Sequence, residues 1–219
     1  MAWAQDTSER TETSTRTDVL RASPPMFESR LLDACSRVHP TVPILIFGPA
    51  IAALASWSLS NVSLLATIAL AIGGYGLWTL FEYWLHRIVF HFEPDHGIGA
   101  RLHWIIHGIH HEHPNDPLRL VMPPAVSVPL GAAVFGVLYL AFGNDYAPGL
   151  GAGFFAGYLA YDMIHYYVHH FSPRGRLGRM LRERHMRHHF QDDTKGFGIS
   201  APYWDEVFRT SSRAHSGGH

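Results

Sequence analysis

The sequence has little charge and almost no cysteine. Asp, Glu, Lys and Arg together make up 16% of the 219 residues, whereas about 25% is usual for a soluble domain. The single cysteine, Cys35, excludes an intrachain disulfide and a metal site built from paired cysteines. The formal net charge is −1 and no basic stripe with interleaved aromatic residues is present, so the chain is not expected to bind nucleic acid.

Charge is missing above all from four long apolar stretches. They contain 18, 20, 18 and 15 residues and no Asp, Glu, Lys or Arg. A bilayer core takes about 20 helical residues, and the buried helices of a soluble domain would show a polar face that these stretches lack. Very short connections at 60–61 and 143–146 predict two helical hairpins. The predicted transmembrane helices are Val42–Leu59, Val62–Phe81, Ala125–Phe142 and Ala147–Tyr161.

The basic residues predict the orientation of these hairpins. All 17 Lys and Arg residues lie before Val38, within Arg87–Arg119, or from Arg174 onward. Basic segments stay on the cytoplasmic side of a membrane, so both termini and the Arg87–Arg119 segment are expected in the cytoplasm. The N-terminal region has many charges and no apolar run, which excludes a signal peptide. Residues 1–22 are expected to be a disordered cytoplasmic tail and residues 211–219 a flexible C-terminal tail.

Histidine is abundant, with 17 residues, and most of them form four internal groups with the spacings HxxxxH, HxxHH, HxxxH and HxxHH. Residues three or four apart share one face of a helix, so each of the last three groups is expected to project from one side of its helix. In HxxxxH the two rings diverge on an α-helix, and this group is expected at a helix end or a kink. The ten residues are His86, His91, His107, His110, His111, His165, His169, His185, His188 and His189.

The predicted hairpins bring all four groups to the cytoplasmic face of the membrane. Imidazole nitrogens are good ligands for iron, zinc and nickel, and ten ligands exceed what one ion can use, so two metal ions are expected. His103 lies one turn before His107 and is expected to orient a ligand from outside. The remaining histidines are interpreted as ordinary interfacial or surface residues.

Two non-enzymatic interpretations are less favoured. A membrane metal transporter would place ionisable residues near the middle of its spans, whereas these spans are uncharged. A structural zinc site would use about four ligands per ion, often cysteines.

The histidine series and the text around it resemble a known family. The stretches Arg119–Pro124 (RLVMPP), Tyr161–Tyr167 (YDMIHYY) and Gly196–Ser200 (GFGIS) are similar to the membrane fatty acid hydroxylase and sterol desaturase superfamily, and in particular to its fatty acid 2-hydroxylases. The similarity runs over residues 23–210. The resemblance implies an all-α integral membrane domain there, with four transmembrane helices under a cytoplasmic helical cap that holds a dimetal histidine site.

The same resemblance implies the chemistry. The ten histidines carry over as ligands of two iron ions, with zinc able to occupy the site in purified protein. The implied reaction is O2-dependent insertion of a hydroxyl at carbon 2 of a long-chain fatty acyl group, free or in a ceramide-like lipid. Tyr161 and Asp162 match a segment associated with the polar head of the substrate, and Arg119 is a weaker candidate for pairing with a carboxylate. A sterol or carotenoid hydroxylase of the same superfamily is the alternative.

One departure from the family pattern concerns electron supply. Many eukaryotic relatives carry an N-terminal haem-binding domain, which the roughly forty residues before the first predicted span are too few to form. The electrons are therefore expected to come from a separate donor, a ferredoxin or a small haem protein. A bacterial inner membrane is the expected location.

Overall fold

Long apolar helices form one half of the molecule. The computed structural model describes residues 15–212, which contain helices and no strand. Three of the helices are long and apolar enough to cross a membrane, namely Thr41–Asn61 (α3), Leu64–Phe90 (α4 with the π-helix η1) and Pro124–His170 (α7). Only 17 to 22% of their most apolar windows is buried inside the protein. Large side chains such as Leu65, Ile72 and Leu140 are more than two-thirds exposed along them, as expected where lipid surrounds a helix.

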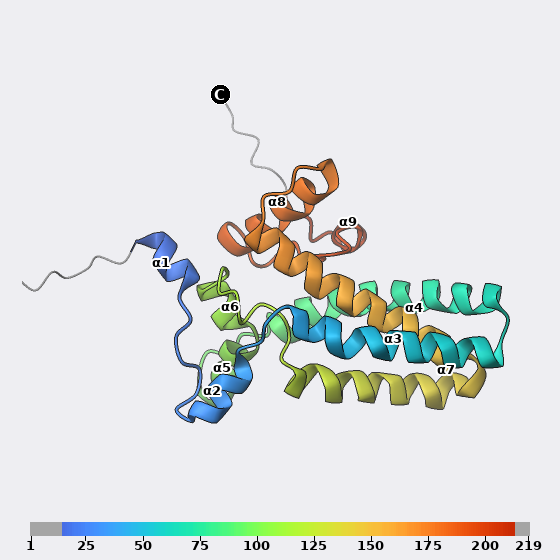
Figure 1. Cartoon of the computed structure of the whole chain (residues 1–219). Coiled ribbons are helices and arrows are strands. Elements are labelled where there is room, and N and C mark those ends of the chain that lie inside the picture. The colour runs from blue at the N-terminus through green and yellow to red at the C-terminus, as the bar shows by residue number, and fades with distance from the viewer. Residues whose placement is uncertain (1–14, 213–219) are drawn as a thin grey trace, which may run out of the picture.

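Helix α7 reverses direction at a single glycine. Gly143 has φ 70° and ψ −172°, outside the helical region, and it separates two helical arms. Figure 1 shows the two arms of α7 lying beside α3 and α4, with the reversal at the far end of the bundle. The connection expected at 143–146 is therefore one residue long. A residue without Cβ can take this positive φ at no steric cost. The chain therefore reverses at Gly143 alone, and residues 144–146 are helical.

The helices of the bundle pack through small residues and aromatic rings. A Cβ added at Gly153 would collide with the main-chain carbonyl of Ala71, and one added at Gly74 with that of Leu150. Small residues that let two backbones approach closely are typical of helix packing in membranes. On the side nearer the cap, Trp78 packs edge-on against Tyr158. The middle of α4 is thus held tightly against the second arm of α7.

The other half of the molecule is a cap of short elements at one end of the bundle (Figure 1). It surrounds the ends of α4 and α7 from which the predicted histidines project. Its elements are α1 (Arg16–Arg21), α2 (Arg30–Ser36), α5 (Gly97–His103), the π-helix η2 (Trp104–Gly108), α6 (Ile109–Glu112), α8 (Arg176–Phe190) and α9 (Tyr203–Val207).

The predicted N-terminal tail is partly helical. Of the residues expected to be disordered, 1–14 lie outside the described part of the chain, whereas Arg16–Arg21 form α1. Thr15 caps this helix, because its hydroxyl accepts from the Asp18 amide while the Asp18 carboxylate accepts from the Thr15 amide. Such a capping box satisfies two free donors at a helix start, which explains why a polar, charged segment is helical here. Most of the predicted C-terminal tail, 213–219, also lies outside the described residues.

Candidate metal centre

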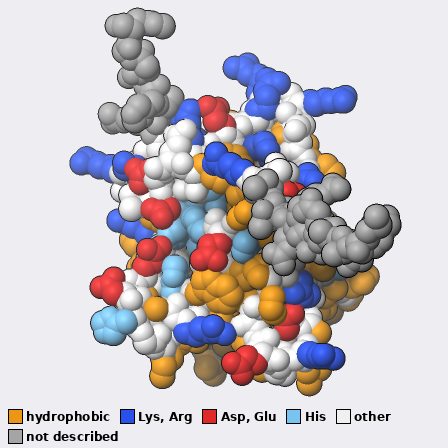
Figure 2. All heavy atoms as spheres, turned by 90° about the vertical axis from the view of Figure 1, so that its left-hand side faces the viewer, with side chains coloured by type: hydrophobic (Ala, Val, Ile, Leu, Met, Phe, Trp, Pro, Cys, Tyr) orange, Lys and Arg blue, Asp and Glu red, His pale blue; other side chains and the backbone are white. Residues whose placement is uncertain are grey.

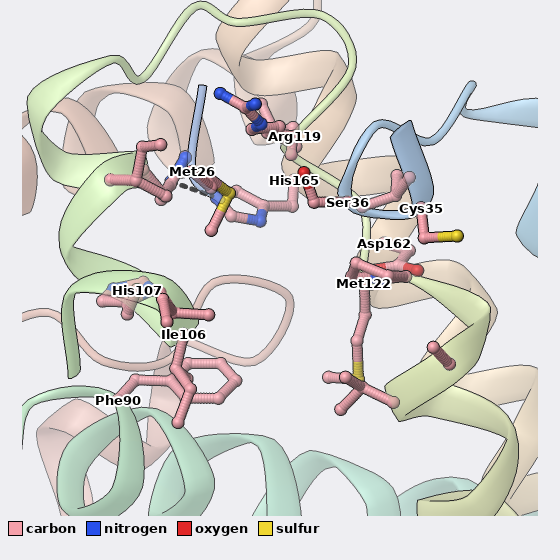
Figure 3. Close-up of a pocket in the computed structure, with 18 of the residues that line it drawn as sticks. Met26, Cys35, Ser36, Phe90, Ile106, His107, Arg119, Met122, Asp162 and His165 are labelled. Atoms are coloured by element: carbon pink, nitrogen blue, oxygen red, sulfur yellow. Dashed lines mark hydrogen bonds between the residues drawn. The ribbon is translucent and has the colours of Figure 1, made fainter. Parts of the chain in front are cut away.

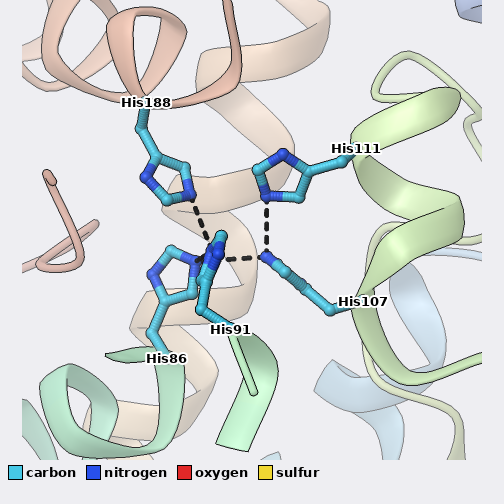
Figure 4. A group of neighbouring side chains, drawn as sticks. All are labelled: His86, His91, His107, His111 and His188. Atoms are coloured by element: carbon cyan, nitrogen blue, oxygen red, sulfur yellow. Dashed lines mark hydrogen bonds between the residues drawn. The ribbon is translucent and has the colours of Figure 1, made fainter. Parts of the chain in front are cut away.

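The structure brings all ten predicted histidines together at the cap end of the bundle, in two clusters of five. Within each cluster, one ring nitrogen from every histidine lies within 4.8 Å of the others. Figure 4 shows the five rings of the first cluster pointing toward one another. Cluster A comprises His86, His91, His107, His111 and His188. Cluster B comprises His110, His165, His169, His185 and His189.

A π-helix explains how the HxxxxH pair meets. Residues Leu85–Phe90 form the π-helix η1, and the His91 amide donates to the His86 carbonyl, five residues back. In this wider helix, residues five apart lie above one another. The Nε2 atoms of His86 and His91 are 3.3 Å apart. The rings therefore converge, where a regular α-helix would have separated them, and the expected kink is a change of helix type.

Each HxxHH group divides its histidines between the two clusters. In the first group His107 and His111 face cluster A, with their Nε2 atoms 3.0 Å apart, while His110 reaches across to cluster B. The second group does the reverse. His188 joins cluster A, and His185 and His189 join cluster B. HxxxxH goes wholly to cluster A and HxxxH wholly to cluster B, so each cluster draws on three of the four groups.

The facing nitrogens of cluster A cannot all be hydrogen-bonded to one another. Nδ1 of His86 lies 2.7 Å from the Phe197 carbonyl and Nδ1 of His188 lies 2.7 Å from the Lys195 carbonyl. A carbonyl only accepts, so both Nδ1 atoms carry the hydrogen and both Nε2 atoms present lone pairs. His91 Nε2 lies 3.3 Å from Nε2 of His86 and 3.1 Å from Nε2 of His188, and a single N–H on His91 could satisfy only one of these two acceptors. Converging lone pairs of this kind fit a bound cation.

In cluster B the Nε2 atoms also lie close together, but most of the Nδ1 atoms have no hydrogen-bond partner among the described residues. Nε2 of His165 lies 3.1 Å from that of His110, and Nε2 of His185 lies 2.8 Å from that of His169. Nδ1 of His165, His169, His185 and His189 is buried without a hydrogen-bond partner among the described residues. An all-imidazole donor set suits iron, zinc, copper or nickel, so both clusters fit the metal centre that the sequence predicts.

Burial keeps these imidazoles neutral, as metal ligands must be. Desolvation, helped by the neighbouring His188, lowers the pKa of His91 and of His111 to about 3. Burial also lowers the pKa of His107 and His185 well below the usual value. The unprotonated rings are therefore ready to bind a cation at neutral pH.

An apolar cavity of about 280 Å³ reaches both clusters. His107 of cluster A and His110 and His165 of cluster B are among the residues that line it. Figure 3 shows Phe90 and Ile106 on one side of the cavity, opposite Met122 and Asp162. The ring of Phe90 stacks on His107 at 5.0 Å.

The two residues predicted to face the substrate head also line this cavity. Tyr161 lies beside His165, with ring centroids 5.6 Å apart. Asp162 is 1% exposed, and its Oδ2 has no hydrogen-bond partner among the described residues. A buried carboxylate oxygen without a partner is unfavourable unless a ligand supplies a donor.

The N-terminal segment forms one wall of the cavity, which the sequence did not predict. Met26 and Leu32 line it, and so do Cys35 and Ser36 of α2. Arg119, whose side chain is 3% exposed, holds this segment through an ion pair with Asp33 at 2.8 Å and a bond to the Pro24 carbonyl. Two nitrogens of the Arg119 guanidinium are thus already paired, while its Nε has no hydrogen-bond partner among the described residues.

Comparison with known proteins identifies this arrangement. A family model described as fatty acid hydroxylase matches residues 70–210, which include most of α4, both clusters and α9. The chain belongs to the fatty acid hydroxylase family. It is 40% identical over 148 residues to dihydroceramide fatty acyl 2-hydroxylase FAH1 of Arabidopsis thaliana, covering 68% of this chain and 62% of that protein. It is 36% identical over 188 residues to FAH2 of the same plant, covering 85% of this chain and 79% of that protein.

A solved structure of a family member has the same fold. The chain superposes on a protein described as full-length scs7p, of which only the hydroxylase domain is visible, with a TM-score of 0.80 and 33% identity. The match covers 84% of this chain and 70% of that one. With three membrane-length helices and this fold, the chain is a multi-pass membrane protein.

Some features of the candidate metal centre could not be predicted from the sequence. The carbonyls of Lys195 and Phe197 act through main-chain atoms, which any residue has. Glu93 places a carboxylate oxygen 3.9 Å from Nδ1 of His91 and 3.7 Å from Nε2 of His103. His103 therefore lies beside the centre, near the outer side of His91. The five-residue spacing of HxxxxH was the one signal that could have predicted the π-helix.

Proposed function

We propose that this chain inserts a hydroxyl, with O2 as co-substrate, at carbon 2 of a long-chain fatty acyl group. One observation carries the proposal. The cavity has a mostly apolar lining that suits an acyl chain, and histidines of both clusters are part of that lining. Plant relatives named as dihydroceramide fatty acyl 2-hydroxylases support the same reaction. The cavity would hold the chain and exclude water, while the histidines in its lining place one carbon beside the centre.

The proposed cofactors are two iron ions, one in each cluster. An acyl C–H bond is unreactive, and side chains alone do not oxidise it, so a redox metal supplies the oxidising chemistry when bound. Zinc has no redox chemistry, and a zinc-loaded form is expected to be inactive. The contribution of the protein is to hold neutral imidazoles in place and to orient the substrate.

The polar residues of the cavity favour a substrate whose head group is neutral and can donate a hydrogen bond. Oδ2 of Asp162 could accept a hydrogen bond from an amide N–H or a hydroxyl, and Tyr161 would pack beside it. The Arg119 guanidinium, a basic side chain in the cavity lining, is already engaged by Asp33 and so offers less to a free carboxylate. Of the two substrates expected, a ceramide-like lipid fits these residues better than a free acid.

The reaction needs two electrons and two protons from outside, because one oxygen atom enters the C–H bond and the other leaves as water. We propose a separate electron donor, a ferredoxin or a small haem protein. Figure 2 shows histidine side chains at the surface in the middle of the cap face, among acidic and basic side chains. His91, His111 and His189 are half-buried, so electrons could reach the centre from this face.

We further propose four membrane crossings, with α3, α4 and each arm of α7 contributing one. The cap and both termini would then lie in the cytoplasm, in agreement with the distribution of Lys and Arg. The domain limits of 23–210 and the bacterial inner membrane stay predictions.

The test is the hydroxy-acid profile of hydrolysed lipids from a host that expresses the full chain. Its matched control is an equally expressed His110→Ala, His188→Ala double variant, which removes one histidine from each cluster. A 2-hydroxy acyl product that requires the intact protein is the expected result. If a folded, iron-loaded protein yields none, even with a working electron donor and candidate lipids, position 2 is wrong. A sterol or carotenoid substrate would then be tested next.

A further inference from the structure

The loop that contains Lys195 and Phe197 forms hydrogen bonds with histidines of cluster A. The carbonyls of Lys195 and Phe197 accept hydrogen bonds from Nδ1 of His188 and His86, each at 2.7 Å. Both histidines belong to cluster A. In cluster B, four of the five Nδ1 atoms have no hydrogen-bond partner among the described residues. The two clusters therefore differ in what fixes the orientation of their rings.

A buried carboxylate holds this loop. Asp205, 2% exposed, accepts from the Phe197 amide with Oδ1 at 2.9 Å and from the Gly198 amide with Oδ2 at 3.0 Å. Oδ1 also accepts from the Thr210 hydroxyl at 2.8 Å, which in turn lies 2.9 Å from the Tyr83 hydroxyl. Both oxygens of Asp205 are thus occupied, and the peptide group between Phe197 and Gly198 is fixed in one orientation.

A second buried carboxylate holds the far end of the loop. Glu82, on α4 one turn before His86, accepts from the Ser200 amide at 2.8 Å and from the Ser200 hydroxyl. Gly198 has no room for a side chain, because a Cβ there would lie 2.5 Å from the Ala201 carbonyl and 3.1 Å from Oδ2 of Asp205. The loop is therefore tightly packed, and a change at Asp205 is transmitted to its carbonyl groups.

We propose that Asp205 is a positioning residue for the metal ion of cluster A. By fixing the Phe197–Gly198 peptide, it directs the Phe197 carbonyl at Nδ1 of His86, which keeps the Nε2 lone pair of His86 turned toward the centre. Hydrogen bonds that orient the far nitrogen of a histidine ligand typically change metal affinity 10- to 100-fold when they are lost. This inference rests on the proposed metal centre and goes further, because it assigns Asp205 to one of the two ions.

Asp205→Asn tests the assignment with a nearly isosteric change. An asparagine NH2 group cannot accept from a main-chain N–H, so one of the Phe197 and Gly198 amides loses its partner and the loop must shift. The measurement is transfer of Zn2+ from the purified, zinc-loaded full chain to a chelator, with metal content per chain. We expect one of the two ions to bind roughly 10- to 100-fold more weakly than in the unaltered protein, with the other unchanged.

Three matched variants make the result specific. Asp116→Asn removes a carboxylate that is equally buried, at 3% exposed, but that accepts from the Leu118 amide and lies beside Arg119; both ions are expected to stay. His188→Ala and His185→Ala, on the same helix, should each remove one ion, from cluster A and cluster B respectively. The ion weakened by Asp205→Asn should be the one that His188→Ala removes, so a double variant with His188→Ala adds no further loss.

Two results would overturn the proposal, namely unchanged transfer of both ions in Asp205→Asn, or equal weakening of both. If Asp205→Asn does not fold, Thr210→Val removes only the hydroxyl between Tyr83 and Asp205 and should weaken the same ion to a smaller extent. If neither His188→Ala nor His185→Ala lowers the metal content, the proposed metal centre itself is wrong, which is a different outcome.

Discussion

The two histidine clusters have the same number of rings but are built differently. Cluster A includes histidines from both π-helices. The loop that contains Lys195 and Phe197 fixes the orientation of its His86 and His188. Cluster B takes its five from α6, α7 and α8, all of them α-helical. Two members of cluster A, His91 and His111, are half-buried, against one in cluster B. Helix packing can therefore position the histidines of cluster B. Cluster A also depends on main-chain carbonyls and lies nearer to solvent.

The largest effect expected is loss of activity from single ligands on one helix. His185→Ala and His188→Ala lie one turn apart on α8 and face different clusters. Each should remove one metal ion and abolish hydroxylation, because the proposed reaction uses both ions. Metal content per chain and hydroxy-acid analysis provide the measurement, with the exposed His96→Ala as a control that retains both. Loss of both ions from either variant would show that the clusters act as one site.

A smaller effect is expected at the cavity. Tyr161→Phe with Asp162→Asn removes a hydroxyl from the cavity wall and replaces a carboxylate with a neutral amide, and it changes no histidine of either cluster. A lost hydrogen bond of about 1 kcal/mol lowers kcat/KM several-fold. Turnover and head-group preference, measured with ceramide-like and free-acid substrates, should change while metal content stays at the level of the unaltered protein. Unchanged turnover and preference would remove Tyr161 and Asp162 from the substrate site.

Metal release should distinguish the clusters in the unaltered protein. Since His91 and His111 are half-buried, a chelator is expected to take the ion of cluster A first. Transfer of Zn2+ should therefore show a fast and a slow phase. The fast phase should be missing in His188→Ala and the slow phase in His185→Ala. The reverse assignment would mean that exposure does not control release.

The smallest effect concerns acid stability of the metal-free protein. The pKa of His91 and of His111 is about 3 in the folded protein, against about 6.5 in an unfolded chain. Between these values the unfolded chain binds more protons, so stability is lost as pH falls through this range. The melting temperature of chelator-treated protein should fall between pH 7.5 and pH 5. The double variant His91→Gln, His111→Gln should show a shallower decline.

Much of this architecture could be predicted from the sequence. Uncharged apolar stretches predicted the membrane helices, and the four histidine spacings predicted which ten side chains meet. The division of His107 and His110 between different clusters could not be predicted, because spacings of three and four both place residues on one helix face. The role of the Phe197 carbonyl was also hidden, since it depends on a main-chain atom and on the distant Asp205.

The crossed pattern of the two HxxHH groups has a consequence for how the clusters are spaced. On η2 and α6, His107 and His110 join the clusters with ring centroids 5.5 Å apart, and on α8 His185 and His188 do so at 5.9 Å. Both pairs are three residues apart, a rise of about 4.5 Å along a helix. Two separate helical segments therefore set nearly the same distance between a histidine of cluster A and a histidine of cluster B. The spacing of the two clusters therefore follows from helix geometry. A shift of either segment would move histidines of both clusters together.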